Sequence, residues 1–230
     1  MKKKINMRKL TGLILVISLF LSLIFSMVRL ILAPSEVPAG EPYTKVKTDY
    51  ILMVLECILG LVVSFLPSMI SRRWRIIVPN TVYILYFIFL YCAIYLGEIL
   101  EFYYIVPHWD TMLHAFSGAM LGAFGFVLVD LLNRDVKVHV NLSPFFVSLF
   151  AFCFALAFGS LWEIYEFSFD GLLGINMQKY MSQQGVSLVG HEALKDTMKD
   201  IITDAIAALL VSLIGYFSAR KHLEETAEDL

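Results

Sequence analysis

Six long apolar segments limit what this chain can fold into. A helix needs about 20 mostly apolar residues to cross the hydrocarbon core of a bilayer. The spans predicted by this rule are Leu10–Leu32, Tyr50–Ile70, Ile76–Leu96, Met112–Leu132, Leu142–Trp162 and Ile201–Ala219. None of them shows the alternation of a membrane β-strand. We therefore expect an all-α fold, a polytopic transmembrane helical bundle with six spans, in which residues 1–230 form a single integral membrane domain.

Composition supports a lipid-exposed surface. Of the 230 residues, 59% are hydrophobic and only 17% are charged, whereas average soluble domains are nearer half apolar and a quarter charged. The net charge of −2 provides no basic surface for nucleic acid. These features exclude an ordinary soluble enzyme and predict a multi-pass protein of the cell (inner or plasma) membrane in contact with the lipid bilayer. The first span is longer than the apolar region of a signal peptide, so we expect it to be retained as an anchor.

The distribution of Lys and Arg predicts the orientation of the spans. Loops that remain in the cytoplasm are enriched in these residues. Twelve of the 18 fall on the side of the two termini: Lys2, Lys3, Lys4, Arg8, Lys9, Arg72, Arg73, Arg75, Arg134, Lys137, Arg220 and Lys221. Both termini are therefore expected to be cytoplasmic, together with an acidic tail at residues 220–230.

The fourth span begins with a polar helix face. Asp110 and His114 are four residues apart, so they share one face of a helix, and Gly118 and Gly122 continue it. Because small residues let another helix approach closely, this face is expected to point into the bundle. The alternative for Asp110 is a helix N-cap.

Two further acidic stripes are expected at the same outer depth. Each has the spacing of a single helix face: Glu163, Glu166 and Asp170 after the fifth span, and Asp196, Asp200 and Asp204 at the start of the sixth. Solvated acids at the interface, or acids that favour a helix N-terminus, are the alternative interpretation. Asp204 is harder to explain in that way, because it lies inside the apolar segment, where a carboxylate must pair, bind a cation or be protonated.

Carboxylates combined with an imidazole are suitable ligands for Mg²⁺, Mn²⁺, Ca²⁺ or Zn²⁺. Metals held in this way could activate a water or hold a phosphate. The candidate metal ligands are Asp110, His114, Glu163, Glu166, Asp170, Asp196, Asp200 and Asp204. The candidate catalytic residues are Asp110, His114, Glu163 and Asp204. Because the HExxH, GxSxG and phosphate-loop motifs are absent, the reaction type stays open.

Three kinds of function fit these observations. The first is metal-dependent chemistry on a lipid or isoprenoid head group at the outer leaflet. The second is a cation-binding transporter or permease with Asp204, Glu56 and His114 on its path, although the inner halves of the spans carry few ionisable residues. The third is a non-catalytic interaction protein whose acids only fix helix packing.

Three segments carry a resemblance to a known family. They are HWDTMLHAFSGAMLG (His108–Gly122), LWEIYEFSFD (Leu161–Asp170) and DTMKDIITDAIAALL (Asp196–Leu210). Together they resemble the YjdF-type bacterial inner-membrane proteins, over about Tyr50 to Phe217. The resemblance implies a polytopic helical membrane protein in which the eight candidate ligands form a shared site, and it implies no activity. The Asp110–His114 pair is also similar to a short motif of VanZ-like membrane proteins.

Overall fold

The structure is a computed structural model of the chain and describes residues 6–37, 44–133, 142–182 and 185–228. Several residues used to predict the orientation lie outside these ranges: Lys2, Lys3, Lys4, Arg134 and Lys137. The last two residues of the acidic tail, Asp229 and Leu230, lie outside them as well.

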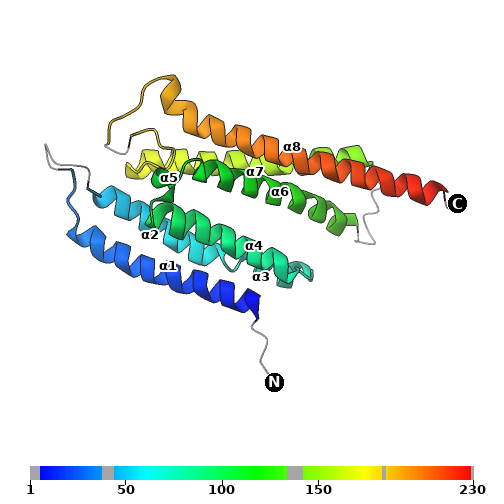
Figure 1. The fold of residues 1–230 in the computed structure, drawn as a ribbon, viewed down its shortest axis with the longest axis horizontal. Coiled ribbons are helices and arrows are strands. Elements are labelled where there is room, and N and C mark those ends of the chain that lie inside the picture. Colours follow the sequence, from blue (N-terminus) through cyan, green and yellow to red (C-terminus); the bar gives the residue numbers. More distant parts are fainter. Residues whose placement is uncertain (1–5, 38–43, 134–141, 183–184, 229–230) are drawn as a thin grey trace. The chain divides into compact units, whose positions relative to one another are not determined.

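The described residues form long helices (Figure 1). In chain order they are α1 (Met7–Leu32), α2 (Lys47–Val63), α3 (Leu66–Trp74), α4 (Asn80–Leu90), the π-helix η1 (Tyr91–Ile99), α5 (Phe102–Ile105), α6 (Trp109–Asn133), α7 (Pro144–Leu173) and α8 (His191–Glu228). Six segments are long and apolar enough to cross a membrane: Met7–Leu32, Lys47–Trp74, Asn80–Ile99, Trp109–Leu132, Pro144–Leu173 and His191–His222. The predicted all-α fold with six spans is confirmed, while the orientation of the termini stays a prediction.

The helices are longer than the apolar segments that predicted them. The fifth predicted span stopped at Trp162, but α7 continues to Leu173. The sixth was expected to begin at Ile201, but α8 begins at His191. Hydropathy predicts the part of a helix that contacts lipid. It does not predict where the helix ends, because backbone hydrogen bonding can continue through polar turns. The acidic stripes therefore lie on the same helices as the spans.

The chain divides into two compact units. The first unit comprises Met1–Asp110, Phe169–Met177 and Met181–Val186, and the second comprises Thr111–Ser168, Gln178–Tyr180 and Ser187–Leu230. In the first unit, α1 packs against α2 and α4. Its core contains Leu15, Leu19, Cys57, Leu90 and Ile94.

Small residues bring the three helices of the second unit close together. Gly125 of α6 faces α7, where a Cβ added to it would lie 2.7 Å from the Cα of Ala151. Gly122 faces α8, where an added Cβ would lie 3.7 Å from the Cα of Ala208. Within this unit α6 and α8 run parallel, and α7 runs antiparallel to both (Figure 1). Substitution of these glycines by larger residues would therefore separate the helix backbones.

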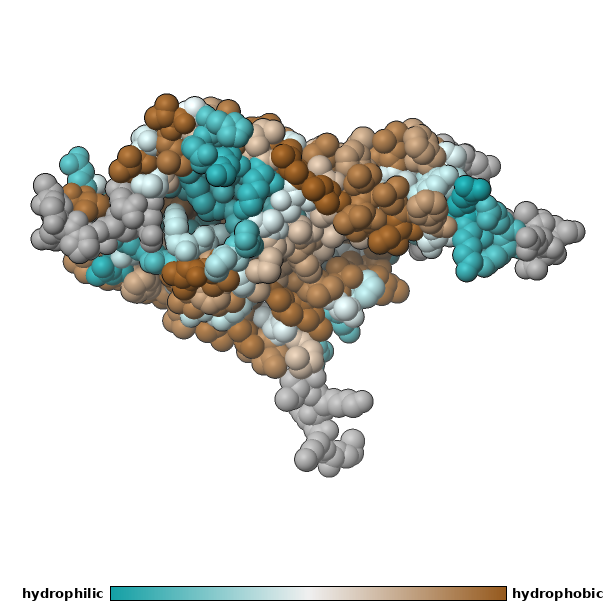
Figure 2. Space-filling view, turned by 45° about the horizontal axis from the view of Figure 1, so that its top comes forward, coloured by the Kyte–Doolittle hydropathy of each residue, from teal (hydrophilic) through white to brown (hydrophobic). Residues whose placement is uncertain are grey.

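The middle of α8 exposes an apolar surface between hydrophilic ends (Figure 2). Its large exposed side chains include Ile202, Ile206, Leu210, Ile214 and Phe217. A continuous apolar helix surface of this length is typical of contact with lipid tails. The side of α8 that carries Asp200, Asp204 and Ala208 is buried instead, which places its carboxylates inside the unit.

Candidate functional site

His114 of α6 lies between two buried aspartates of α8. Its Nδ1 atom is 3.3 Å from Oδ2 of Asp204, and its Nε2 atom is 3.9 Å from Oδ2 of Asp200. The exposed fraction of the His114 side chain is 11%, and Asp200 and Asp204 are buried more completely. Two carboxylates thus face opposite nitrogens of one imidazole where solvent is largely excluded.

Glycines on two helices make room for Asp204. A Cβ added to Gly118, one turn after His114 on α6, would lie 3.0 Å from the Asp204 Cα and 2.9 Å from its carbonyl oxygen. A Cβ added to Gly159 of α7 would collide with Asp204 Oδ2 and lie 3.1 Å from Cγ. The expected close packing at Gly118 and Gly122 is confirmed. The contact explains how a carboxylate can lie at a junction of three helices.

Ser117 and Gly159 contribute to this site in ways that sequence reasoning did not identify. The Ser117 hydroxyl lies 3.5 Å from Oδ1 of Asp204 and donates a 3.0 Å hydrogen bond to the carbonyl oxygen of His114. Gly159 precedes Glu163 by four residues, so it occupies the same face of α7 one turn earlier. This four-residue spacing could have revealed the role of Gly159 from the sequence, because it places a small residue on the predicted acidic face of α7. A small residue there allows a close helix contact.

Glu163 is buried on α7, with an exposed fraction of 3%. Gly159 of the same helix contacts Asp204. α7 and α8 are antiparallel (Figure 1). One turn towards the C-terminus of α7 therefore lies at the same height as one turn towards the N-terminus of α8. Glu163 is therefore level with Asp200, so acids from two helices lie at the same height in the second unit.

Asp110 extends the cluster along α6. It lies in the first turn of this continuous helix, which begins at Trp109, so the structure does not place it at the N-cap position. One ligand atom each from Asp110, His114 and Asp200 lies within 4.8 Å of the others. Among the residues that the structure describes, this is the group of three or more acidic, His or Cys side chains with the spacing needed to hold a metal ion.

The other three predicted ligands have local partners. Glu166 accepts a 2.8 Å hydrogen bond from Nε1 of Trp162 on the same helix. Asp170 is buried in the first unit and accepts a 2.7 Å hydrogen bond from the backbone N–H of Met177. In the second unit, Asp196 forms a 3.3 Å ion pair with Lys179. Each of these three carboxylates thus has a partner that it helps to hold in place. A metal-binding role for them stays a prediction.

Comparisons with known proteins agree with the membrane assignment. Residues 11–221 match the model of a family described as "Predicted membrane protein (DUF2238)". A Thermotoga maritima protein described as uncharacterized is 28% identical over 123 residues, which cover 53% of this chain and 54% of that relative. The chain thus spans about half the length of the curated relative that it matches. No solved structure matches the chain significantly.

Proposed function

The chain belongs to the DUF2238 family of predicted membrane proteins, and we propose that it binds a divalent metal ion through Asp110, His114 and Asp200. The metal would serve chemistry on a lipid or isoprenoid head group. The observation that carries the proposal is the 4.8 Å grouping of two carboxylates and one imidazole in a buried part of the helix bundle. Buried carboxylates need compensation, and a divalent cation is the compensation that this donor set suits.

The two nitrogens of His114 have different tasks in this proposal. Nδ1 faces Asp204 at 3.3 Å, so Nε2 is the nitrogen on the side of Asp200 that would bind the metal. A carboxylate that accepts the Nδ1–H bond fixes the tautomer and the ring orientation of a metal-binding histidine. Asp204 is thus a positioning residue in this site, rather than one of the three ligands.

A metal held by three side chains retains positions for a water molecule or for a substrate oxygen. Glu163 is buried and level with Asp200. A metal bound there would supply Lewis-acid activation of a water, and we assign Glu163 the role of holding the proton that such a water would give up.

The substrate class follows from the depth of the cluster within the spans. Asp200 immediately precedes Ile201, where the apolar segment of α8 begins. An end of a spanning segment lies near lipid head groups. Phosphate-bearing head groups are anionic and offer hard oxygen ligands to a metal, so they are the substrates that this site suits best.

The first test measures bound metal. The full chain, purified in detergent and dialysed against Mg²⁺, Mn²⁺, Ca²⁺ or Zn²⁺, should retain about one equivalent of at least one ion by elemental analysis. Asp200→Asn should lose it. Glu192→Gln is the matched control, because Glu192 pairs with Lys195 at the surface of α8 and is not a candidate ligand. Absence of metal from the wild-type protein under all four conditions would contradict the proposal.

The second test separates the enzyme from the alternatives. The metal-loaded protein is incubated with membrane lipid extract, and head-group release is followed by mass spectrometry. Release that needs both the metal and Glu163 supports the enzyme. Metal-coupled ion flux in vesicles without release supports a transporter, whereas metal binding with neither effect supports a structural or interaction role. The similarity to YjdF-type and VanZ-like proteins supplies no activity with which to choose among them.

A further inference from the structure

The first unit carries four arginines at the end where α1 begins. Arg72 and Arg73 lie in the last turn of α3, Arg75 directly follows that helix, and all three are exposed. Arg8 lies in the first turn of α1. We call these four residues the arginine cluster. None of them belongs to the proposed metal site, so they require an explanation of their own.

Tyr83 of α4 joins the segments that carry the arginine cluster. The guanidinium of Arg8 stacks on the Tyr83 ring, with Cζ 3.4 Å from the ring centroid. The Tyr83 hydroxyl donates a 3.3 Å hydrogen bond to the carbonyl oxygen of Pro67 in α3, and the residue is only 2% exposed. Stacking uses the face of the Arg8 guanidinium, so the N–H groups in its plane can still bind an anion.

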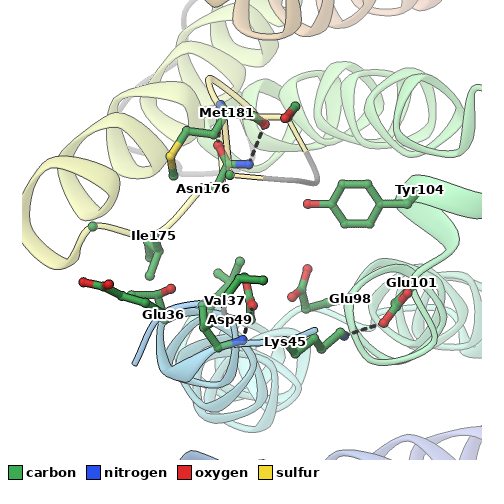
Figure 3. A pocket seen from close by; sticks show the side chains of 16 residues that line it. Glu36, Val37, Lys45, Asp49, Glu98, Glu101, Tyr104, Ile175, Asn176 and Met181 are labelled. Atoms are coloured by element: carbon green, nitrogen blue, oxygen red, sulfur yellow. Dashed lines mark hydrogen bonds and ion pairs between the residues drawn. The ribbon is translucent and has the colours of Figure 1, made fainter. Parts of the chain in front are cut away.

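No carboxylate of the neighbouring sequence balances the charge of the arginine cluster. Asp and Glu are absent from residues 1–35 and 57–97, which contain all four arginines. In the part of the chain that the structure describes, the four form no ion pair. By contrast, in the polar cavity beyond the far end of α1, Lys45 forms a 2.9 Å ion pair with Glu101 (Figure 3). The counter-charge of the arginine cluster therefore has to come from outside the described chain.

The helix α3 has the features of a segment at the surface of a membrane. It ends the candidate span Lys47–Trp74, and none of its residues is buried. Its exposed apolar side chains include Met69 and Trp74, with exposed fractions of 61% and 48%. Trp side chains favour the head-group region, and long arginine side chains lie along apolar surface with the guanidinium toward the phosphates. This arrangement supplies a lipid, rather than a soluble protein, as the neighbour of the arginine cluster.

We propose that the arginine cluster binds the phosphate of an anionic phospholipid in the leaflet that surrounds the start of α1. Arginine suits this ligand because its guanidinium can donate two parallel hydrogen bonds to one phosphate. A zwitterionic lipid carries the same phosphate together with a cation, which the arginines repel. The cluster should therefore select phosphatidylglycerol over phosphatidylcholine. Each basic residue near an anionic membrane surface contributes about fivefold to the affinity.

Lipid binding is measured by native mass spectrometry of the full chain in detergent, titrated with phosphatidylglycerol or with phosphatidylcholine. The wild-type protein should bind phosphatidylglycerol about tenfold more tightly or better, and the preference should fall as ammonium acetate is raised. Arg72→Gln and Arg73→Gln should each lower the phosphatidylglycerol affinity about fivefold, and the double variant about 25-fold. Unchanged phosphatidylcholine affinity shows that a variant is folded.

Two further double variants separate the arginine cluster from positive charge in general. Arg220→Gln/Lys221→Gln removes the same charge from exposed positions of α8, where these residues pair with Glu224 and Glu225. Its phosphatidylglycerol affinity should change less than about twofold, because the removed cations already have anionic partners. Arg72→Lys/Arg73→Lys keeps the charge and should retain most of the affinity.

Three results would overturn the proposal. The first is equal affinity of the wild-type protein for the two lipids. The second is an equal loss of phosphatidylglycerol affinity in Arg72→Gln/Arg73→Gln and in Arg220→Gln/Lys221→Gln. The third is displacement of phosphatidylglycerol by inorganic phosphate, which would identify a site for a free anion. Loss of metal binding in Asp200→Asn has no bearing on these measurements, so the two proposals fail separately.

Discussion

His114 directs Nδ1 toward Oδ2 of Asp204, 3.3 Å away, across the contact between α6 and α8. The two residues are far apart in sequence, and their approach depends on Gly118, which leaves space for the backbone of α8. The pair orients an imidazole whose other nitrogen is on the side of Asp200.

Asp204→Asn should reduce metal affinity about 10- to 100-fold, the effect expected when the partner of a metal-binding histidine is changed. Asparagine retains the shape of the side chain but not its negative charge, so His114 loses an anionic acceptor at Nδ1. Metal affinity is measured by competition with a fluorescent chelator. Glu192→Gln is the control, because Glu192 lies on the same helix, pairs with Lys195 and is not a candidate ligand. Equal affinities in wild type and Asp204→Asn would disprove the positioning role.

Gly159→Ala should also lower metal affinity, although no charge is removed. The new methyl group would collide with Asp204 Oδ2 and displace the carboxylate from His114. We expect a smaller loss than for Asp204→Asn, measured in the same competition assay. Gly171→Ala is a matched glycine on the same helix, since nothing lies within 4 Å of its added Cβ. If both alanine variants bind metal like the wild type, Asp204 does not depend on the space at Gly159.

Gly118→Leu should destabilise the protein by about 3 kcal/mol, at the upper end of the cost of overpacking. Its side chain would be forced against Asp204, whose carbonyl oxygen is 2.9 Å from an added Cβ. Denaturant unfolding of the purified protein, followed by circular dichroism, provides the measurement. Gly171→Leu should change stability little for the reason given above. Similar unfolding midpoints for the two variants would show that the contact tolerates a large side chain.

The Lys and Arg distribution predicts the position of reporters on the two sides of the membrane. A phosphatase or fluorescent reporter fused after Leu230 should report a cytoplasmic location. The same reporters inserted between Gly174 and Gly190 should report an external one. An external C-terminus would place the Asp110–His114 end of α6 on the cytoplasmic side of the membrane instead of the outer side. The head-group proposal would then apply to the inner leaflet.

Much of the fold could be predicted from local sequence patterns. Apolar length predicts the six spans because a helix must cover the thickness of the bilayer with apolar side chains. The Gly118–Gly122 spacing predicts a close helix contact because residues four apart share a face. Helix ends were predicted less well. The start of α8 at His191 precedes the apolar segment, since polar turns can continue a helix without contacting lipid.

Periodicity along the chain indicates which acids share a helix face, whereas the packing of the helices sets which acids meet across them. The spacing of acids along one helix shows only which of them share a face. It therefore grouped Asp196, Asp200 and Asp204 but did not show which residues elsewhere in the chain each of them contacts. The register between helices follows from packing: Gly118 and Gly159 hold Asp204 beside His114, while the chain after α7 brings Lys179 to Asp196. Such contacts depend on side-chain volumes on several helices at once, which no single local pattern contains.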